Sequence, residues 1–188
     1  RDRATVRAAM RWVTEIKFGL LAALGLAAWT LLAWKLGWHD QDFTNAQHGK
    51  KVAAAAFALG VWGAVRERRA SQAGWLNFGE GFRTGVLVCA ITAFLNGAFL
   101  AAYSRVLNPG WLQRAWEWQK AGLIAAGAKE SELGRPEAIA TASQNLFYQL
   151  VLDPIGKVMV GLILATAVAA MLRRKPPEET AGESRPVD

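Results

Sequence analysis

Residues 75–103 read WLNFGEGFRTGVLVCAITAFLNGAFLAAY, and the rest of the chain is interpreted around this stretch. Its polar, glycine-containing start, with Glu80 and Arg83, leads into an apolar run at residues 85–103 that contains no charged side chain. As an α-helix this run rises roughly 1.5 Å per residue and is about 28 Å long, close to the hydrocarbon thickness of a bilayer. The stretch therefore predicts a transmembrane helix.

The 188-residue chain carries a net charge of +7, but its basic residues do not indicate a nucleic-acid-binding surface. Many of them form short clusters beside apolar runs, namely Arg66, Arg68, Arg69, Arg173, Arg174 and Lys175. Such flanking clusters are typical of membrane proteins, whereas nucleic-acid-binding domains collect basic residues on one face. The length predicts one domain, and the charge pattern favours a lipid bilayer over a nucleic acid as its partner.

Four apolar runs predict an all-α fold, an integral membrane four-helix bundle. The spans are predicted at residues 18–36, 50–65, 79–104 and 154–172, between a basic cytoplasmic N-terminal segment at 1–17 and a polar cytoplasmic tail at 173–188. The second span is the shortest, because its apolar part covers only about fourteen residues. Lys50 and Lys51 can lengthen it by laying their aliphatic stems along the apolar surface.

Two amphipathic segments separate the third and fourth predicted spans. An Asn-Pro-Gly triplet at residues 108–110 predicts the end of the third helix, and residues 111–128 then gather tryptophan, leucine and alanine on one helical face. The second segment, 136–152, starts with a proline suited to the first position of a helix, and the Asp-Pro pair at 153–154 predicts that a new helix begins there. Both segments are predicted to be interfacial helices on the outer face.

Basic residues lie mostly at one end of the predicted spans: they precede the first, connect the second to the third, and follow the fourth. This bias predicts that both termini face the cytoplasm. Eight of the nine tryptophans fall toward the two predicted interfaces. We expect a multi-pass protein of the bacterial cytoplasmic (inner) membrane. The first apolar run is too long for a signal peptide and lacks a cleavage motif, so it is expected to be retained.

Small residues at four-residue spacing predict how the spans pack. Inside a bilayer, helices associate where small side chains let the backbones approach closely. The third and fourth spans offer such ridges at Gly81, Gly85, Cys89, Gly161 and Ala165. Cys89 is the single cysteine, so the chain can form neither an internal disulfide nor a metal site built on several thiolates, and we interpret it as a small buried hydrophobe.

Polar side chains within or beside the spans are the candidate functional residues. Asn96 is the only amide inside a predicted span, where it either forms an interhelical hydrogen bond or contacts a substrate. Lys157 follows Asp153 by four residues, which predicts an ion pair, with a proton relay as the alternative. Asn77 is predicted to cap the third helix in a capping box with Glu80 at N3, which would explain Glu80 and Arg83 as parts of a capped helix start; alternatively they bind a lipid head group or a partner loop.

The first outer loop raises the possibility of a metal site, because it contains His39, Asp40, Asp42 and His48. Their spacing matches no standard metal-binding motif, so we expect a mobile, solvated polar loop. The chain shows no nucleophile–base pair and no phosphate-binding loop. We therefore predict no enzyme activity, no catalytic residue, no cofactor and no metal ion.

The stretch LNFGEGFRTG resembles a bacterial integral-membrane family of unknown function, domain-of-unknown-function family 4199. The resemblance rests on an aromatic-Gly-x-x-Phe-Lys/Arg-x-Gly pattern, which here comprises Phe78, Gly79, Phe82, Arg83 and Gly85. It extends to Asn108-Pro109 and to the amphipathic region before the last span, and covers roughly residues 10–172. It implies four spans, although the second is shorter here than the family pattern implies. It implies no activity, so no catalytic residue is carried over.

Three hypotheses for function follow. The leading one is a non-enzymatic structural or accessory subunit that packs against other membrane proteins or against copies of itself. The alternative is a small oligomeric transporter or channel that uses Asn96 and Lys157. The third is a lipid-acting enzyme at the outer membrane interface that uses His39 or His48.

Overall fold

The computed structural model describes residues 12–40 and 43–174, and these residues are almost entirely helical. The long helices are α2 (Val13–Lys35), α3 (His48–Ala70), α4 (Phe78–Ala102), α5 (Trp111–Ala125), α6 (Glu130–Ser143) and α7 (Asp153–Leu172). A short 3-10 segment, η1 (Phe43–Gln47), precedes α3. Two π-helical segments, η2 (Tyr103–Leu107) and η3 (Tyr148–Leu152), continue α4 and lead into α7. The predicted all-α class is confirmed, whereas most of the predicted N-terminal segment and tail lies outside the described residues.

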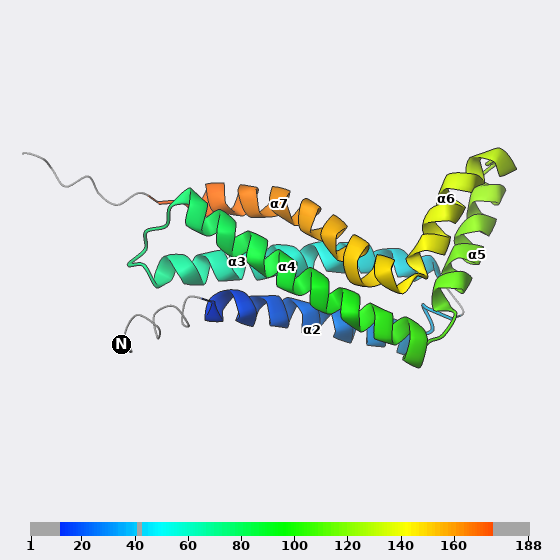
Figure 1. The fold of residues 1–188 in the computed structure, drawn as a ribbon, viewed down its shortest axis with the longest axis horizontal. Helices are drawn as coiled ribbons and strands as arrows, with labels where there is room; N and C mark the ends of the chain where they lie inside the picture. The colour runs from blue at the N-terminus through cyan, green and yellow to red at the C-terminus, as the bar shows by residue number, and fades with distance from the viewer. Residues whose placement is uncertain (1–11, 41–42, 175–188) are drawn as a thin grey trace, which may run out of the picture.

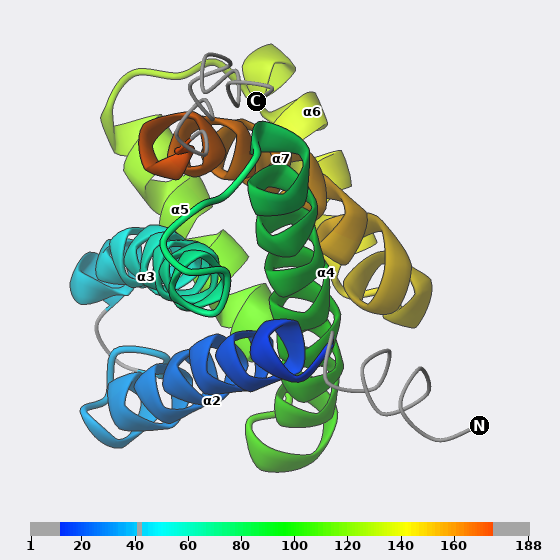
Figure 2. The same ribbon diagram turned by 90° about the vertical axis from the view of Figure 1, so that its left-hand side faces the viewer.

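Helices α2, α3, α4 and α7 lie side by side, and α4 contacts each of the other three (Figures 1 and 2). The hydrophobic core lies where α3 meets α4, at Val61, Val65, Val88 and Cys89. The α5–α6 hairpin leaves one end of this helical body at a steep angle to its long axis (Figure 1). The molecule therefore consists of an elongated helical body with a hairpin projecting from one end.

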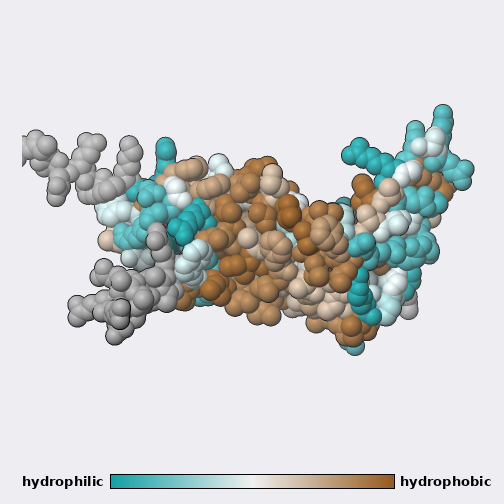
Figure 3. Space-filling model, in the orientation of Figure 1, coloured by the Kyte–Doolittle hydropathy of each residue, from teal (hydrophilic) through white to brown (hydrophobic). Residues whose placement is uncertain are grey.

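Three helical stretches of the described residues are long and apolar enough to cross a membrane: Val13–Lys35, Phe78–Leu107 and Tyr148–Leu172. Figure 3 shows an apolar middle between more polar ends, so the chain has the composition of a membrane protein. Helix α3 contains the predicted second span but does not meet the same criterion. The physical reason is its composition, because lysines at its start and arginines at its end lower the mean hydropathy of its 23 residues. Its crossing stays a prediction.

The predicted small-residue ridges of α4 and α7 lie against each other. A Cβ atom added at Gly85 would lie 2.7 Å from the Cβ of Ala165, and one added at Gly161 would lie 2.7 Å from the Cβ of Cys89. One turn before Gly85, an added Cβ at Gly81 would lie 3.2 Å from the Cβ of Ala169. Since real Cβ atoms essentially never approach to 2.7 Å, Gly85 and Gly161 permit the close contact between these two helices.

The start of α4 is capped as its sequence predicts. The side chain of Asn77 accepts a hydrogen bond of 2.8 Å from the backbone nitrogen of Glu80, which satisfies one of the free donors of the first turn. The structure gives no return bond from the Glu80 carboxylate to the backbone nitrogen of Asn77. Only the first half of the predicted capping box is therefore present.

The region before the last span differs from the sequence-based boundaries. Helix α6 begins at Glu130 rather than 136, so Pro136 lies inside it, and the helix stops at Ser143 rather than running to 152. Helical structure resumes shortly afterwards, where the Asn145 side chain accepts a hydrogen bond from the backbone nitrogen of Phe147. Helix α7 begins at Asp153 as predicted, but Asp153 has helical dihedrals (φ −64°, ψ −47°) rather than those of an N-cap, so the π-helical η3 leads directly into it. A π-helical turn is wider than an α-helical one, and proline is a common cause of such local distortions.

Candidate functional site

A group of five polar residues joins the hairpin to the helical body, and we call it the outer cluster: His39, Asp40, Tyr103, Asn108 and Arg114. His39 and Asp40 follow α2, Tyr103 begins η2, Asn108 lies in the turn before α5, and Arg114 lies on α5. The two carboxylate oxygens of Asp40 accept from three sides: Oδ1 accepts from Arg114 (2.7 Å) and Asn108 (3.0 Å), and Oδ2 accepts from Trp34 Nε1 (2.9 Å). Asp40 thus links the end of α2 to the start of the hairpin.

Tyr103 connects Asn108 to His39 through hydrogen bonds. Asn108 Nδ2 donates to the Tyr103 hydroxyl oxygen at 3.0 Å, and that oxygen lies 2.9 Å from His39 Nδ1. Either the Tyr103 hydroxyl donates to an unprotonated Nδ1, or a protonated Nδ1 donates to the second lone pair of the hydroxyl oxygen, depending on the His39 tautomer. Burial lowers the pKa of His39, and the smaller opposing effect of the nearby Asp40 carboxylate raises it. The His39 ring also stacks on Trp111, with 5.0 Å between the ring centroids.

This arrangement corrects the prediction of a mobile, solvated loop, because His39 is buried and hydrogen-bonded. His48 begins α3 rather than joining the outer cluster, and Asp42 lies outside the described residues. In the described part of the chain, no group of three or more His, Cys, Asp or Glu residues is placed to hold a metal ion. Asp40, Asn108 and Arg114 form hydrogen bonds with one another, so the outer cluster holds the start of the hairpin against the end of α2.

The predicted ion pair on α7 is present. Lys157 Nζ lies 2.6 Å from Asp153 Oδ2, and both side chains are about seven-tenths buried. Lys157 lines a cavity of about 120 Å³ beneath the hairpin together with Leu100, Trp111 and Gln149. Asn96, by contrast, is 6% exposed and does not line that cavity. The two residues proposed for a shared transport path thus do not meet there.

Asn96 lies on the side of α4 that faces the interior of the helical body. One turn earlier, Thr92 donates a hydrogen bond of 3.3 Å to the backbone oxygen of Gly19 in α2. Among the described residues, the structure gives the Asn96 amide no hydrogen-bond partner. The interhelical hydrogen bond predicted for Asn96 is therefore made by Thr92 instead.

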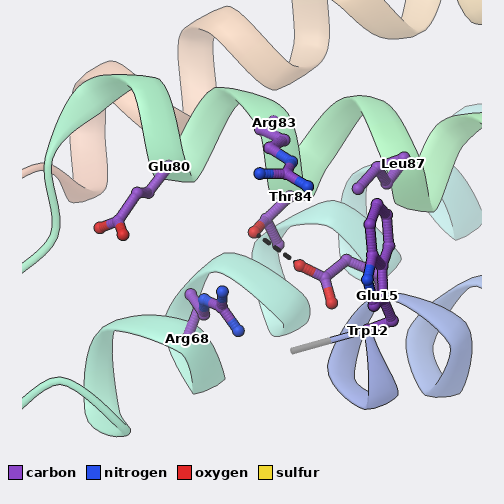
Figure 4. Close-up of a pocket in the computed structure, with 7 residues that line it drawn as sticks. All are labelled: Trp12, Glu15, Arg68, Glu80, Arg83, Thr84 and Leu87. Carbon is purple, nitrogen blue, oxygen red and sulfur yellow. Dashed lines mark hydrogen bonds between the residues drawn. The ribbon is translucent and has the colours of Figure 1, made fainter. Parts of the chain in front are cut away.

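At the opposite end of the helical body, Glu80 and Arg83 line a small pocket with residues from α2 and α3 (Figure 4). Thr84 donates a hydrogen bond of 3.1 Å to Glu15 Oε1, whereas the buried Oε2 of the same carboxylate has no protein partner in the described chain. The pocket volume of about 20 Å³ is sufficient for one water molecule, which would satisfy Oε2. Arg83 lies over Trp12, with 5.0 Å from its Cζ atom to the ring.

Several of these residues were not identified from the sequence: Glu15, Tyr103, Arg105, Arg114 and Gln149. Each lies in a segment that was interpreted from its overall composition. That composition is basic around Glu15 and apolar or amphipathic around the others. The sequence did contain one indication of them: Arg105 and Gln149 are single strongly polar side chains among mostly apolar neighbours. Polar groups at such positions need partners, so each one predicts a contact, although not with which residue.

Comparison with known proteins gives one match. The family model described as a protein of unknown function (DUF4199) matches residues 17–174, which is most of the chain. The chain belongs to this family. The match confirms the resemblance found in the sequence and includes every helix described above except the first turn of α2. No curated protein and no solved structure matches the chain.

Membership in the DUF4199 family brings no activity, because the family is defined as one of unknown function. Function is therefore inferred from the geometry of this chain. The outer cluster, the cavity beneath the hairpin and the exposed hairpin itself all lie at the same end of the molecule, so that end is the candidate functional region.

Proposed function

We propose that this chain is a non-enzymatic integral membrane protein, a structural or accessory subunit that packs against other membrane proteins. Helices α2, α3, α4 and α7 cross the bilayer as a four-helix bundle, and both termini face the cytoplasm of a bacterial cell. The α5–α6 hairpin lies along the outer membrane interface with its amphipathic helices. The steep angle between the hairpin and the axis of the helical body supports this placement (Figure 1), because a helix at such an angle runs roughly along the membrane plane.

The observation that carries the proposal is an open groove between α5 and α6. It has a volume of about 550 Å³, and its lining includes Leu112, Trp116 and Ile139. Ile139 is 53% exposed. Exposed apolar grooves mark interaction sites, and here the exposed apolar side chain is that of Ile139, whereas Trp116 is already buried. The occupant that fits is an amphipathic helix of a neighbouring membrane protein, which buries its apolar face in such a groove.

The attachment of the hairpin supports the same proposal. Arg114, near the start of α5, is held by Asp40 and by the backbone oxygen of Pro109, and Lys120 of α5 lies 3.8 Å from Glu137 of α6. A surface that is already ordered loses less conformational entropy when a partner binds. The hairpin is therefore suited to binding a partner.

The competing hypothesis of a small oligomeric transporter or channel draws on the buried Asn96, whose amide lacks a hydrogen-bond partner in the described chain. It receives less support, because Lys157 is paired with Asp153 and lines a different region. A lipid-acting enzyme that uses His39 has less support still, since the His39 ring is held between Tyr103 and Trp111.

The test is native mass spectrometry of the protein extracted from its own membranes in a mild detergent. We expect a complex of defined stoichiometry, either with another membrane protein or with further copies of this chain. Ile139→Asp places a charge in the groove and should dissociate the complex. Thr141→Asp is the matched control on the exposed opposite face of α6 and should leave it intact. A strictly monomeric wild-type protein, or a complex insensitive to Ile139→Asp, contradicts the proposal.

A further inference from the structure

The space beneath the hairpin consists of two adjoining hollows, of about 120 and 200 Å³, which share Leu112 and Gln149 in their linings. We call it the sub-hairpin cavity. Arg105 lines one hollow, and Lys157 with Asp153 lines the other. We propose that this cavity binds the phosphate group of a membrane phospholipid, with Arg105 as the residue that binds the phosphate and the lipid tails running along α7.

Arg105 is the strongest indication of an anionic ligand. Its guanidinium donates to Gln149 Oε1 (2.7 Å), to the backbone oxygen of Gln144 (3.3 Å) and to that of Ala101 (3.4 Å). All three acceptors are neutral, and Arg105 forms no ion pair with the described residues. A guanidinium is always charged and has five N–H donors in a fixed plane, an arrangement that matches phosphate. Arg105 is therefore an oriented cation whose counter-ion is not supplied by the described chain.

Gln149 holds Arg105 in this orientation. Its side chain is buried, its Oε1 accepts from Arg105 and from Ser104 (3.4 Å), and its Nε2 donates to the backbone oxygen of Ser143 (2.8 Å). These bonds join η2 to η3 and to the end of α6. Gln149 therefore acts as a positioning residue for Arg105, and the remaining donors of Arg105 are left for a ligand.

The charge of the lining fits a phosphodiester. Arg105 and Lys157 are cationic and Asp153 is anionic, so these three residues leave one positive charge. A phosphodiester carries one negative charge and neutralises it. Lys157 and Asp153 neutralise each other, because Lys157 Nζ lies 2.6 Å from Asp153 Oδ2. Arg105 is therefore the cation that remains available to the phosphate.

The location favours a lipid over a soluble phosphate compound. The cavity lies where the apolar stretches ending at Leu107 and beginning at Tyr148 reach the hairpin. Figure 3 shows the surface hollowed at this place, with apolar residues on the side of the helical body and polar residues on the hairpin. Val160 and Ile163, about one and two turns after Lys157, are 69% and 73% exposed. They give acyl chains an apolar surface beside the polar cavity, as a phospholipid requires.

Titration of the delipidated full chain in detergent, followed by native mass spectrometry, tests the proposal. The probes are short-chain phosphatidylglycerol, the matching diacylglycerol without phosphate, and inorganic phosphate. We expect saturable binding of one phosphatidylglycerol, much weaker binding of diacylglycerol, and no competition by inorganic phosphate. Arg105→Gln should weaken phosphatidylglycerol binding by about tenfold or more, because a charge-assisted contact is lost.

Two further variants keep the result interpretable. Lys120→Gln removes another cation from the hairpin, outside the cavity, and should leave the affinity unchanged. Arg105→Lys keeps the charge but loses the planar fork, so it should bind with intermediate affinity; circular dichroism checks that each variant is folded. Equal binding of diacylglycerol, or an unchanged affinity in folded Arg105→Gln, overturns the proposal. Displacement of the lipid by inorganic phosphate overturns the assignment to a phospholipid.

Discussion

His39 and Tyr103 are separated by 64 positions in the sequence, yet His39 Nδ1 lies 2.9 Å from the Tyr103 hydroxyl oxygen. The contact joins the segment that follows α2 to the π-helical end of α4. Trp111, the first residue of α5, packs against both rings, with centroid distances of 5.0 Å to His39 and 5.6 Å to Tyr103. One buried group therefore fixes the end of one helix, the end of another and the start of the hairpin.

Acidic pH is expected to destabilise the packing of His39 against Tyr103 and Trp111. Burial lowers the pKa of His39 in the folded protein below its ordinary value of about 6.5, so the unfolded chain binds the proton more tightly. As the pH falls through about 6.5 toward the folded pKa, the free energy of unfolding decreases, by at most about 1.4 kcal/mol per pH unit for one group. Above about pH 7 this contribution is fully present. Denaturant unfolding in detergent at several pH values measures it.

Two variants separate His39 from other titrating groups. His39→Gln keeps a hydrogen-bonding side chain but removes the titration, so the loss of stability between about pH 7 and pH 5 should become shallower. His48→Gln is the matched control, because His48 begins α3 outside the outer cluster. An equal slope in wild type and His39→Gln would show that His39 does not carry the effect.

Gly85→Leu is expected to separate α4 from α7. Its Cβ alone would lie 2.7 Å from the Cβ of Ala165 and 3.0 Å from a Val61 methyl, so the helices must move apart. We expect a loss of roughly 1–3 kcal/mol, as for other overpacked sites. Gly25→Leu is the control, since an added Cβ there meets no atom within 4 Å. Thermal unfolding in detergent is the measurement; a correctly inserted Gly85→Leu protein with wild-type behaviour contradicts the interpretation.

Arg114→Met is expected to loosen the hairpin. It removes the donor to Asp40 Oδ1 at 2.7 Å and to the Pro109 backbone oxygen at 3.2 Å, while its aliphatic part is retained. Backbone amides in the first two turns of α5 should exchange with deuterium faster, because local opening becomes less costly. Lys120→Met removes the longer hairpin ion pair and should have a smaller effect there. Unchanged exchange in Arg114→Met would mean that apolar packing alone holds the hairpin.

The ion pair of Lys157 with Asp153 is expected to contribute about 0.5–1 kcal/mol, because both side chains are partly exposed. A double-mutant cycle with Lys157→Met and Asp153→Asn measures this coupling in unfolding experiments. The same variants test the transport hypothesis when flux is measured in reconstituted vesicles. A coupling energy near zero would reduce the pair to two independent surface charges.

The helices were predictable from the sequence where their signals are local. The apolar run at residues 85–103 identified α4, Asn77 identified its start, and the triplet at 108–110 identified the end of its π-helical extension. The helix start predicted at 153–154 agrees with α7, which begins at Asp153, but Asp153 has helical dihedrals rather than the conformation of an N-cap and follows η3 directly. Here the preceding π-helical segment accommodates the proline within a continuous helix.

The outer cluster and the sub-hairpin cavity were not predictable in the same way. Asp40 and Arg114 are 74 positions apart, and Arg105 and Gln149 are 44 apart. The residue types indicated that each polar group needs a partner, but the sequence did not indicate which of several polar residues that partner is. The expectation that a polar loop is solvated was wrong for His39, because the rings of Tyr103 and Trp111 pack against it and bury it.

The sequence by itself determined the all-α class, the apolar helices and the small residues available for packing, because hydropathy, helix breakers and side-chain size act over a few neighbouring positions. Only the tertiary structure decided that Gly85 faces Ala165, that Asp40 clamps Arg114, and that Arg105 faces a cavity without a counter-ion from the described residues. Those outcomes depend on how four helices and a hairpin come together, and on which polar groups far apart in the sequence then lie side by side. The stretch at residues 75–103 accordingly supplies the central helix, while its neighbours determine which of its residues matter.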